Sequence, residues 1–215
     1  MSALVREQVL AVMQRPTLGD RLIVTPLLDR EQQIGSGSID LRLGTEFLEA
    51  DRQNQTVIRP PRAGSRIGVA SHERKYVPLG SEFVLHPGQF VLGSTLEFLA
   101  IPADLVGQVL SRSSWGRLGL LVATAVVIQP GFKGVLTLEL VNTGTVPIQL
   151  RAGLRIAQLQ LWQAEAPTSR PYSLTGQYAA PLGPESPKFT REQEELEKLS
   201  VIADRLLGAH APGSG

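Results

Sequence analysis

The stretch Ile128-Gln-Pro-Gly-Phe-Lys-Gly-Val-Leu-Thr-Leu-Glu-Leu-Val-Asn142 predicts a tight turn that leads into a β-strand. Proline presets the backbone for a turn, and the glycine after it accepts conformations that other residues resist. Beyond the turn, apolar and polar residues alternate, so that three leucines share one face while Thr137 and Glu139 point to the other. This pattern predicts a strand with an apolar inner face and a polar outer face.

Short strands of this kind recur through most of the chain. Strand-forming runs separated by turn residues are Leu22–Val24, Ile39–Leu43, Thr56–Ile58, Phe83–Leu85 and Phe90–Leu92. Many short strands without a long helix between them predict an all-β fold, either a barrel or a sandwich. Asp51–Ser71 is rich in arginine, proline and glutamine, and we expect it to be an exposed excursion from that fold.

Helices are predicted at the two ends of the chain. Ser2 is suited to cap a short first helix, which Pro16 stops. The second begins in a segment that fits a capping box, Thr190–Gln193, and Gly208 ends its pattern. Its apolar stripe consists of Leu196, Leu199, Ala203 and Leu206. We expect this stripe to pack on the chain's own core, because so short a seam makes a weak coiled coil.

Between the strands and the second helix, residues 164–187 are heavy in proline, glycine, serine and tyrosine. That composition predicts a tail rather than a packed element. The expected organisation is therefore an all-β domain over residues 1–163, a tail over 164–189 and a helical end over 190–215.

Composition excludes several classes of protein. A net charge of +1 over 215 residues gives no reason to expect polymeric nucleic acid as a partner. The chain has no cysteine, which excludes disulfides and the cysteine-held zinc of the metal-dependent nucleobase deaminases. No apolar run reaches membrane-spanning length and no signal peptide is visible, so we expect a cytoplasmic protein without a membrane partner.

A second stretch, Arg112-Ser-Ser-Trp-Gly-Arg-Leu-Gly-Leu120, places two guanidinium groups and two hydroxyls close together. Phosphate oxygens favour charge and several donors at once, so Arg112, Ser113 and Ser114 suit a phosphorylated ligand. Taken alone, Glu139 is best interpreted as an ordinary solvated carboxylate. A nearby cation and partial burial would instead allow it to exchange a proton with water.

The chain resembles the dCTP deaminase family of the dUTPase-like trimeric superfamily. Six blocks in the family's order carry the resemblance, namely Gly37–Gly44, Leu85–Gly88, Ile101–Gly107, Arg112–Leu120, Ile128–Asn142 and Gly153–Leu159. It implies a distorted β-barrel that assembles as a homotrimer, with active sites between subunits and a mobile tail over each site. It also implies a nucleotide substrate whose triphosphate carries Mg²⁺, without a metal held by the protein.

The resemblance further implies roles for individual residues. Glu139 matches the catalytic glutamate that activates water, and Ser113 and Arg117 match residues that support this chemistry. Residues implied to bind the nucleotide are Arg112, Ser114, Gln129, Thr137, Leu138, Tyr172, Gln177 and Pro181.

Three of these binding positions depart from the family pattern. Gln129 stands where aspartate is usual, Gln177 replaces a phosphate-binding lysine, and Pro181 replaces a glutamine. The favoured hypothesis is hydrolytic deamination of dCTP to dUTP and ammonia. The alternatives are an enzyme that also cleaves the triphosphate or acts on another cytosine nucleotide, and a catalytically weak nucleotide sensor.

Overall fold

The structure, a computed structural model, describes residues 2–50, 72–123, 127–172, 176–178 and 180–208. The chain divides into two compact units. The first comprises Met1–Glu49 and Glu73–Ser186, and the second comprises Ala50–His72 and Pro187–Gly215. The predicted strand Thr56–Ile58 and the predicted excursion Asp51–Ser71 lie outside the described residues.

An antiparallel sheet of ten strands dominates the fold. Its strands are β1 (Ser2–Ala3), β2 (Ile23–Thr25), β3 (Ile39–Ala50), β4 (His72–Tyr76), β6 (Phe90–Ala100), β7 (Leu105–Ser111), β8 (Leu120–Val122), β9 (Val127–Ile128), β10 (Lys133–Asn142) and β12 (Arg155–Gln163). They follow the order β8-β10-β6-β3-β12-β7-β9, with β1 added to β12, β2 to β6 and β4 to β3. The predicted all-β class is confirmed.

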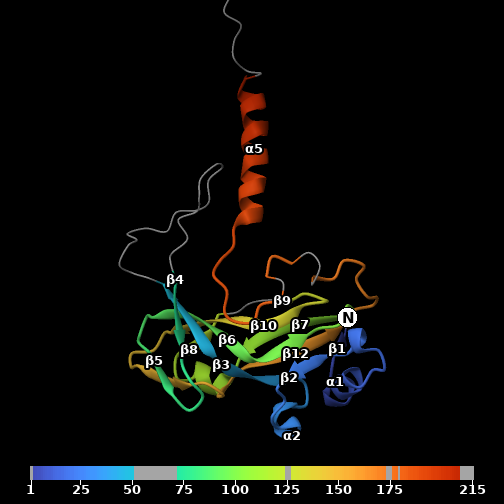
Figure 1. Cartoon of the computed structure of the whole chain (residues 1–215), viewed down its shortest axis with the longest axis vertical. Coiled ribbons are helices and arrows are strands. Elements are labelled where there is room, and N and C mark those ends of the chain that lie inside the picture. Colours follow the sequence, from blue (N-terminus) through green and yellow to red (C-terminus); the bar gives the residue numbers. More distant parts are fainter. Residues whose placement is uncertain (1, 51–71, 124–126, 173–175, 179, 209–215) are drawn as a thin grey trace, which may run out of the picture. The chain divides into compact units, whose positions relative to one another are not determined.

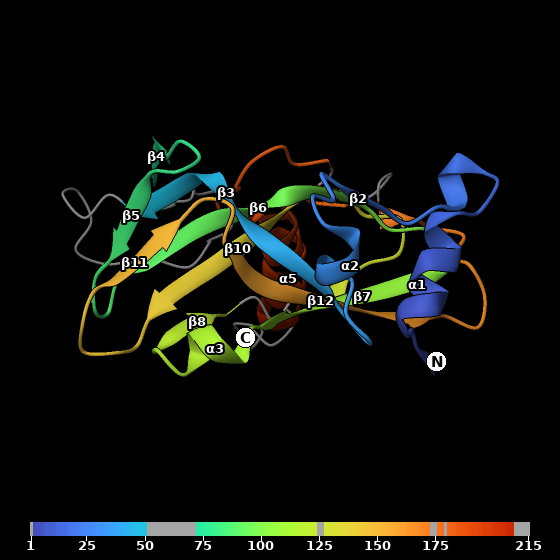
Figure 2. The same ribbon diagram turned by 90° about the horizontal axis from the view of Figure 1, so that it is seen from below.

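A smaller two-stranded sheet pairs β5 (Glu82–Leu85) with β11 (Ile148–Arg151). The short helices of the first unit are α1 (Arg6–Met13), α2 (Arg30–Gln33) and α3 (Ser113–Gly116), and a 3₁₀ turn spans Leu18–Asp20. Within this unit, the β5–β11 ribbon and α1 lie at opposite ends (Figure 2). The long strands β3, β6, β10 and β12 run between them (Figure 1).

Alternation along the long strands builds the core. Apolar side chains of β3, β6, β10 and β12 that are almost fully buried include Leu41, Leu43, Val91, Leu138, Leu140 and Leu159. Burial of such side chains is the main stabilising contribution to a fold of this kind. In β10 and β12, where buried and half-buried residues alternate, the opposite face is available for polar groups.

The predicted capping of the first helix by Ser2 is wrong. Ser2 pairs with Gln163 as part of β1, and the residue before the helix is Val5. The Val5 backbone N–H donates to Gln8 Oε1 at 3.0 Å, so a side chain within the helix satisfies the backbone donor of the residue that precedes it. Pairing of the first residues with β12 therefore shifts the helix start toward Arg6.

In the second unit, α5 spans Thr190–Gly208 and matches the predicted helix. In its apolar stripe, Leu199 and Leu206 are 59% and 62% exposed and Leu196 is half-buried. Packing of this stripe on the core of the first unit stays a prediction. Among the described helices, none has the length and apolar character needed to cross a membrane.

Candidate active site

Strand β10 places Thr137 and Glu139 together on its outer face. Burial along the strand alternates: Leu138 is fully buried in the core, whereas Thr137 and Glu139 are half-buried. A bulge between Val135 and Thr137 shifts the register against β6 just before this pair. Any contact of Leu138 with a nucleotide must therefore use its backbone, since its side chain points into the core.

Apolar side chains flank Glu139 on the same outer face. Val141, two residues further along β10, lies opposite Phe90 of β6 and Leu121 of β8. Directly opposed residues of antiparallel strands share a face. Phe90 and Leu121 are both exposed. The predicted catalytic carboxylate thus lies beside an exposed apolar surface.

The predicted phosphate-binding stretch begins where β7 ends. Arg112 follows the last residue of β7, Ser113 and Ser114 start the single turn of α3, and Arg117 ends it. Ser113, Ser114 and Arg117 are exposed, and Arg112 is half-buried. The hydroxyl of Ser111 bonds to the backbone N–H and C=O of Val122 on β8, which fixes this segment beside the edge of the sheet.

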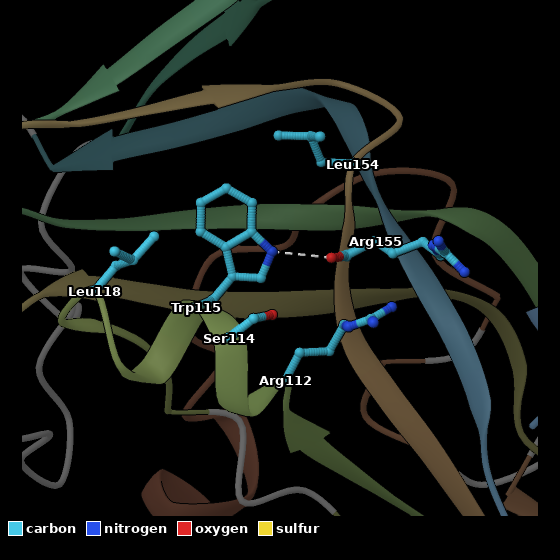
Figure 3. A pocket seen from close by; sticks show the side chains of 6 residues that line it. All are labelled: Arg112, Ser114, Trp115, Leu118, Leu154 and Arg155. Carbon is cyan, nitrogen blue, oxygen red and sulfur yellow. Dashed lines mark hydrogen bonds between the residues drawn. The ribbon is translucent and has the colours of Figure 1, made fainter.

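A pocket of about 310 Å³ opens between α3 and the start of β12. Its described lining consists of Arg112, Ser114, Trp115, Leu118, Leu154 and Arg155 (Figure 3). The Trp115 indole N–H donates to the backbone oxygen of Arg155 at 2.9 Å, and this bond ties the two walls together. The pocket offers two cations, a hydroxyl and an apolar wall, which suits a phosphorylated ligand with an apolar part.

Both arginines of the pocket contact one carboxylate, Asp40. Arg112 and Arg155 form ion pairs with Asp40 Oδ2, and Gln158 Nε2 donates to Oδ1 at 3.1 Å. Sequence reasoning did not place Asp40 or Arg155 at the site, whereas Trp115 lies within the Arg112–Arg117 stretch that the resemblance assigns to it. A signal was present, since Asp40 and Arg155 belong to two of the six family blocks.

A second carboxylate, Glu97, is buried next to this cluster. It accepts hydrogen bonds from Gln33 Nε2 and from the Arg42 backbone N–H, both at 2.8 Å, and Gln33 also donates to the Asp40 carbonyl. Burial raises the pKa of Glu97 above its usual value, although these hydrogen bonds oppose the rise. Glu97 therefore helps to fix the position of β3, the strand that carries Asp40.

The turn at Pro130–Gly131 is present as predicted, and the tail packs on it. Gly131 has φ +81°, and a side chain there would collide with Pro171; one at Gly134 would collide with Pro181. Both glycines therefore accommodate tail prolines. Gln129, just before the turn, is exposed.

The tail is also held by hydrogen bonds. Tyr172 N–H donates to Pro130 O at 2.9 Å, Val135 N–H to Pro181 O at 2.9 Å, and Glu185 N–H to Thr137 Oγ1 at 3.2 Å. The expectation that residues 164–187 are unpacked is therefore wrong for these anchoring points, although no long helix or strand forms among the described residues of that range.

The predicted tail residues take different positions. The Tyr172 ring packs against Phe132 at a centroid distance of 5.9 Å, and its hydroxyl accepts the Tyr178 N–H at 3.2 Å. Pro181 is buried and Gln177 is half-buried. Gln177 has contacts of its own within the fold.

Within the chain, the predicted residues form two groups. Arg112 and Ser114 line the pocket, while Glu139, Thr137 and Tyr172 do not belong to its described lining. β8 connects the two groups, because it pairs with β10 and is bonded to Ser111. No cluster of three or more metal-ligating side chains occurs in the described ranges of the chain.

Comparison with known proteins identifies close relatives. Residues 4–164 match the protein family described as dCTP deaminase-like. A dCTP deaminase of Halorubrum lacusprofundi is 43% identical over 186 residues, which cover 85% of this chain and 90% of that protein. A dUMP-forming dCTP deaminase of Halobacterium salinarum is 41% identical over 186 residues, with coverages of 85% and 94%.

A solved structure shares the fold. The 2'-deoxycytidine 5'-triphosphate deaminase from Agrobacterium tumefaciens aligns with 76% of this chain at a TM-score of 0.54 and 25% identity. The match spans 48% of that chain, about half of its length.

Proposed function

Because this chain belongs to the dCTP deaminase-like family, we propose that it hydrolyses the 4-amino group of dCTP to give dUTP and ammonia. The position of Glu139 carries the proposal. This carboxylate is half-buried on the polar face of β10, beside Thr137 and next to apolar side chains. A carboxylate in such a position can take a proton from a bound water and pass it to a leaving group.

In the proposed reaction, Glu139 takes a proton from water as the water oxygen bonds to C4 of the cytosine ring. This proton passes to N3 as the C4=N3 double bond opens. The remaining hydroxyl proton then passes through Glu139 to the 4-amino nitrogen, the C4–N bond breaks, and ammonia leaves as the uracil carbonyl forms. Ser113 and Arg117 stabilise the charge that develops on the ring. Acid–base help of this kind typically contributes about 10²- to 10⁴-fold to the rate.

The remaining site residues are proposed to hold the nucleotide. Arg112 and Ser114 bind phosphate oxygens at the pocket, and Tyr172 and Gln177 act from the tail. Thr137, Gln129 and the backbone at Leu138 and Pro181 surround the base and sugar. Glu139 and the pocket lie in separate groups within a protomer, so we propose that a homotrimer completes each site across a subunit boundary.

Magnesium is proposed to arrive with the triphosphate as part of the substrate. Asp40, the carboxylate that pairs with Arg112, already accepts bonds from three side chains and offers little to a cation. The triphosphate itself supplies the hard oxygen ligands that Mg²⁺ prefers.

A second candidate, a dCTP deaminase that also releases pyrophosphate and forms dUMP, is favoured by the Halobacterium salinarum relative. Incubation of the purified protein with dCTP, CTP or dUTP and Mg²⁺, followed by chromatography, separates the candidates. The proposal predicts equal amounts of dUTP and ammonia from dCTP. Formation of dUMP and pyrophosphate would favour the second candidate. Binding of dCTP without formation of any uridine nucleotide would indicate a nucleotide sensor.

A further inference from the structure

Asp40 is the meeting point of three side chains from two other segments. β3 places it directly opposite Gln158 of β12, and Arg155 lies three residues before Gln158 on the same strand. Arg112 reaches it from the end of β7. Arg112 and Arg155 donate to Oδ2, the latter at 3.3 Å, and Gln158 donates to Oδ1 at 3.1 Å.

The charges in this cluster do not cancel. One carboxylate faces two guanidinium groups, so the cluster keeps a formal excess of one positive charge. The Asp40 side chain is only 10% exposed, whereas those of Arg112 and Arg155 are 26% and 35% exposed. A buried carboxylate requires partners of this kind, and the excess charge lies on the arginines that line the pocket.

Asp40 also limits the freedom of Arg112. A guanidinium has five N–H donors in a fixed fork, and the contact with Asp40 occupies only one edge of it. A flexible arginine that is already held in its binding orientation loses less conformational entropy when a ligand arrives. Figure 3 shows Arg112 and Arg155 extending in the same direction beside the pocket.

We propose that Asp40 is a positioning residue that holds Arg112 ready for the phosphate groups of the substrate. This inference rests on the proposed function, since it assigns the pocket to the triphosphate. Gln158 and Arg155 keep the Asp40 carboxylate in place, and the bond from Trp115 to Arg155 keeps the segment that carries Arg112 in place.

The test is Asp40→Asn, which keeps the size of the side chain and one acceptor oxygen but removes its charge. We expect the KM for dCTP and the inhibition constant of inorganic tripolyphosphate to rise together by about tenfold, as freeing one or two long side chains costs about that much in affinity. The kcat should change by less than about twofold, because the lost interaction acts on binding.

A double-mutant cycle shows whether Asp40 acts through Arg112. In an Arg112→Gln background, where Arg155 and Gln158 still satisfy Asp40, the Asp40→Asn change should alter KM by less than about twofold. An equal rise of KM in both backgrounds, or no rise in the wild-type background, overturns the inference.

Asp104 provides a matched control. Like Asp40 it accepts hydrogen bonds from an arginine and a glutamine, Arg15 and Gln163, but neither of these donors belongs to the described lining of the pocket, whereas Arg112 and Arg155 do. Asp104→Asn should lower the melting temperature and leave the KM for dCTP and tripolyphosphate inhibition unchanged. If Asp104→Asn raises KM as Asp40→Asn does, the effect is general destabilisation and the inference fails. Absence of turnover in the wild type would contradict the proposed function, while direct binding of tripolyphosphate to the same variants would still decide the role of Asp40.

Discussion

At the scale of single residues, contacts decide what each carboxylate does. Asp104, the residue before β7, faces Arg15, whose two terminal nitrogens donate to its two oxygens at 2.9 and 2.7 Å. Hydrogen bonding from Arg15 lowers the pKa of Asp104, and Gln163 at 3.0 Å adds to this. Glu97 shows the opposite behaviour, because burial raises its pKa.

These directions predict how stability depends on pH. Since the pKa of Asp104 is lower in the folded state, its ion pair stabilises the fold above the unfolded pKa of about 3.9 and loses this effect as pH falls through the folded pKa. We therefore expect Asp104→Asn to cost about 1–3 kcal/mol at pH 7 and progressively less on acidification. Denaturant unfolding of the wild type and of Asp104→Asn from pH 7 to pH 2 measures this difference in unfolding free energy.

The raised pKa of Glu97 has the opposite effect on stability, because it favours the folded state at low pH. Glu97 is present in both the wild type and Asp104→Asn, so its contribution cancels when their unfolding free energies are compared. A gap in unfolding free energy that stays constant down to pH 2 would show that the carboxylate of Asp104 is not the source of the effect.

The sequence was sufficient to predict the outer face of β10, because alternation is a local property. It was not sufficient to find Asp40 as a partner of Arg112, since the two residues are 72 positions apart. Their contact depends on the register between β3 and β12 and on where β7 ends. A pattern within one strand does not contain that information.

At the scale of elements, Asn142 closes the end of β10. Its side-chain amide donates to the backbone oxygens of Leu85 and Val146 at 2.9 Å, and its oxygen accepts the Gly144 N–H at 2.9 Å. Asn142 is fully buried. It therefore joins β10 to the β5–β11 ribbon. Without Asn142, the buried backbone groups that it bonds would have no hydrogen-bond partner in place of water.

We expect Asn142→Ala to destabilise the fold by about 2–4 kcal/mol, because it leaves buried backbone groups without partners. Thr143→Ala is the control: the Thr143 hydroxyl bonds to Gly119 O at an exposed position, and its loss should cost less than about 1 kcal/mol. Chemical denaturation compares the two, and equal losses would contradict the role assigned to Asn142.

The errors of sequence-based prediction at this scale have physical causes. Ser2 has the chemistry of a helix cap, but pairing with Gln163 recruits it into β1. The composition of residues 164–187 predicted a tail rather than a packed element, whereas Pro171 and Pro181 pack closely against Gly131 and Gly134. In each case a contact with a distant segment overrides the local preference.

At the scale of the whole molecule, the outer face of the large sheet predicts self-association. Phe90 and Leu121 are exposed beside Val141 and close to Glu139, and exposed apolar patches commonly mark interfaces. We expect light scattering to give a species three times the 23.2 kDa protomer mass. Phe90→Glu should weaken this species and lower turnover with it. A wild-type protein that is monomeric yet fully active would contradict an active site shared between subunits.

The most direct measurement is the initial rate of ammonia release from dCTP by the wild type and by Glu139→Gln. The substitution is nearly isosteric and lies on the polar face of β10, so folding and assembly should be unchanged. The account predicts a fall in rate of about 10²- to 10⁴-fold or more, since glutamine cannot accept the proton from water. A near-normal rate in the variant, with the same melting temperature and oligomer, would contradict the proposed mechanism.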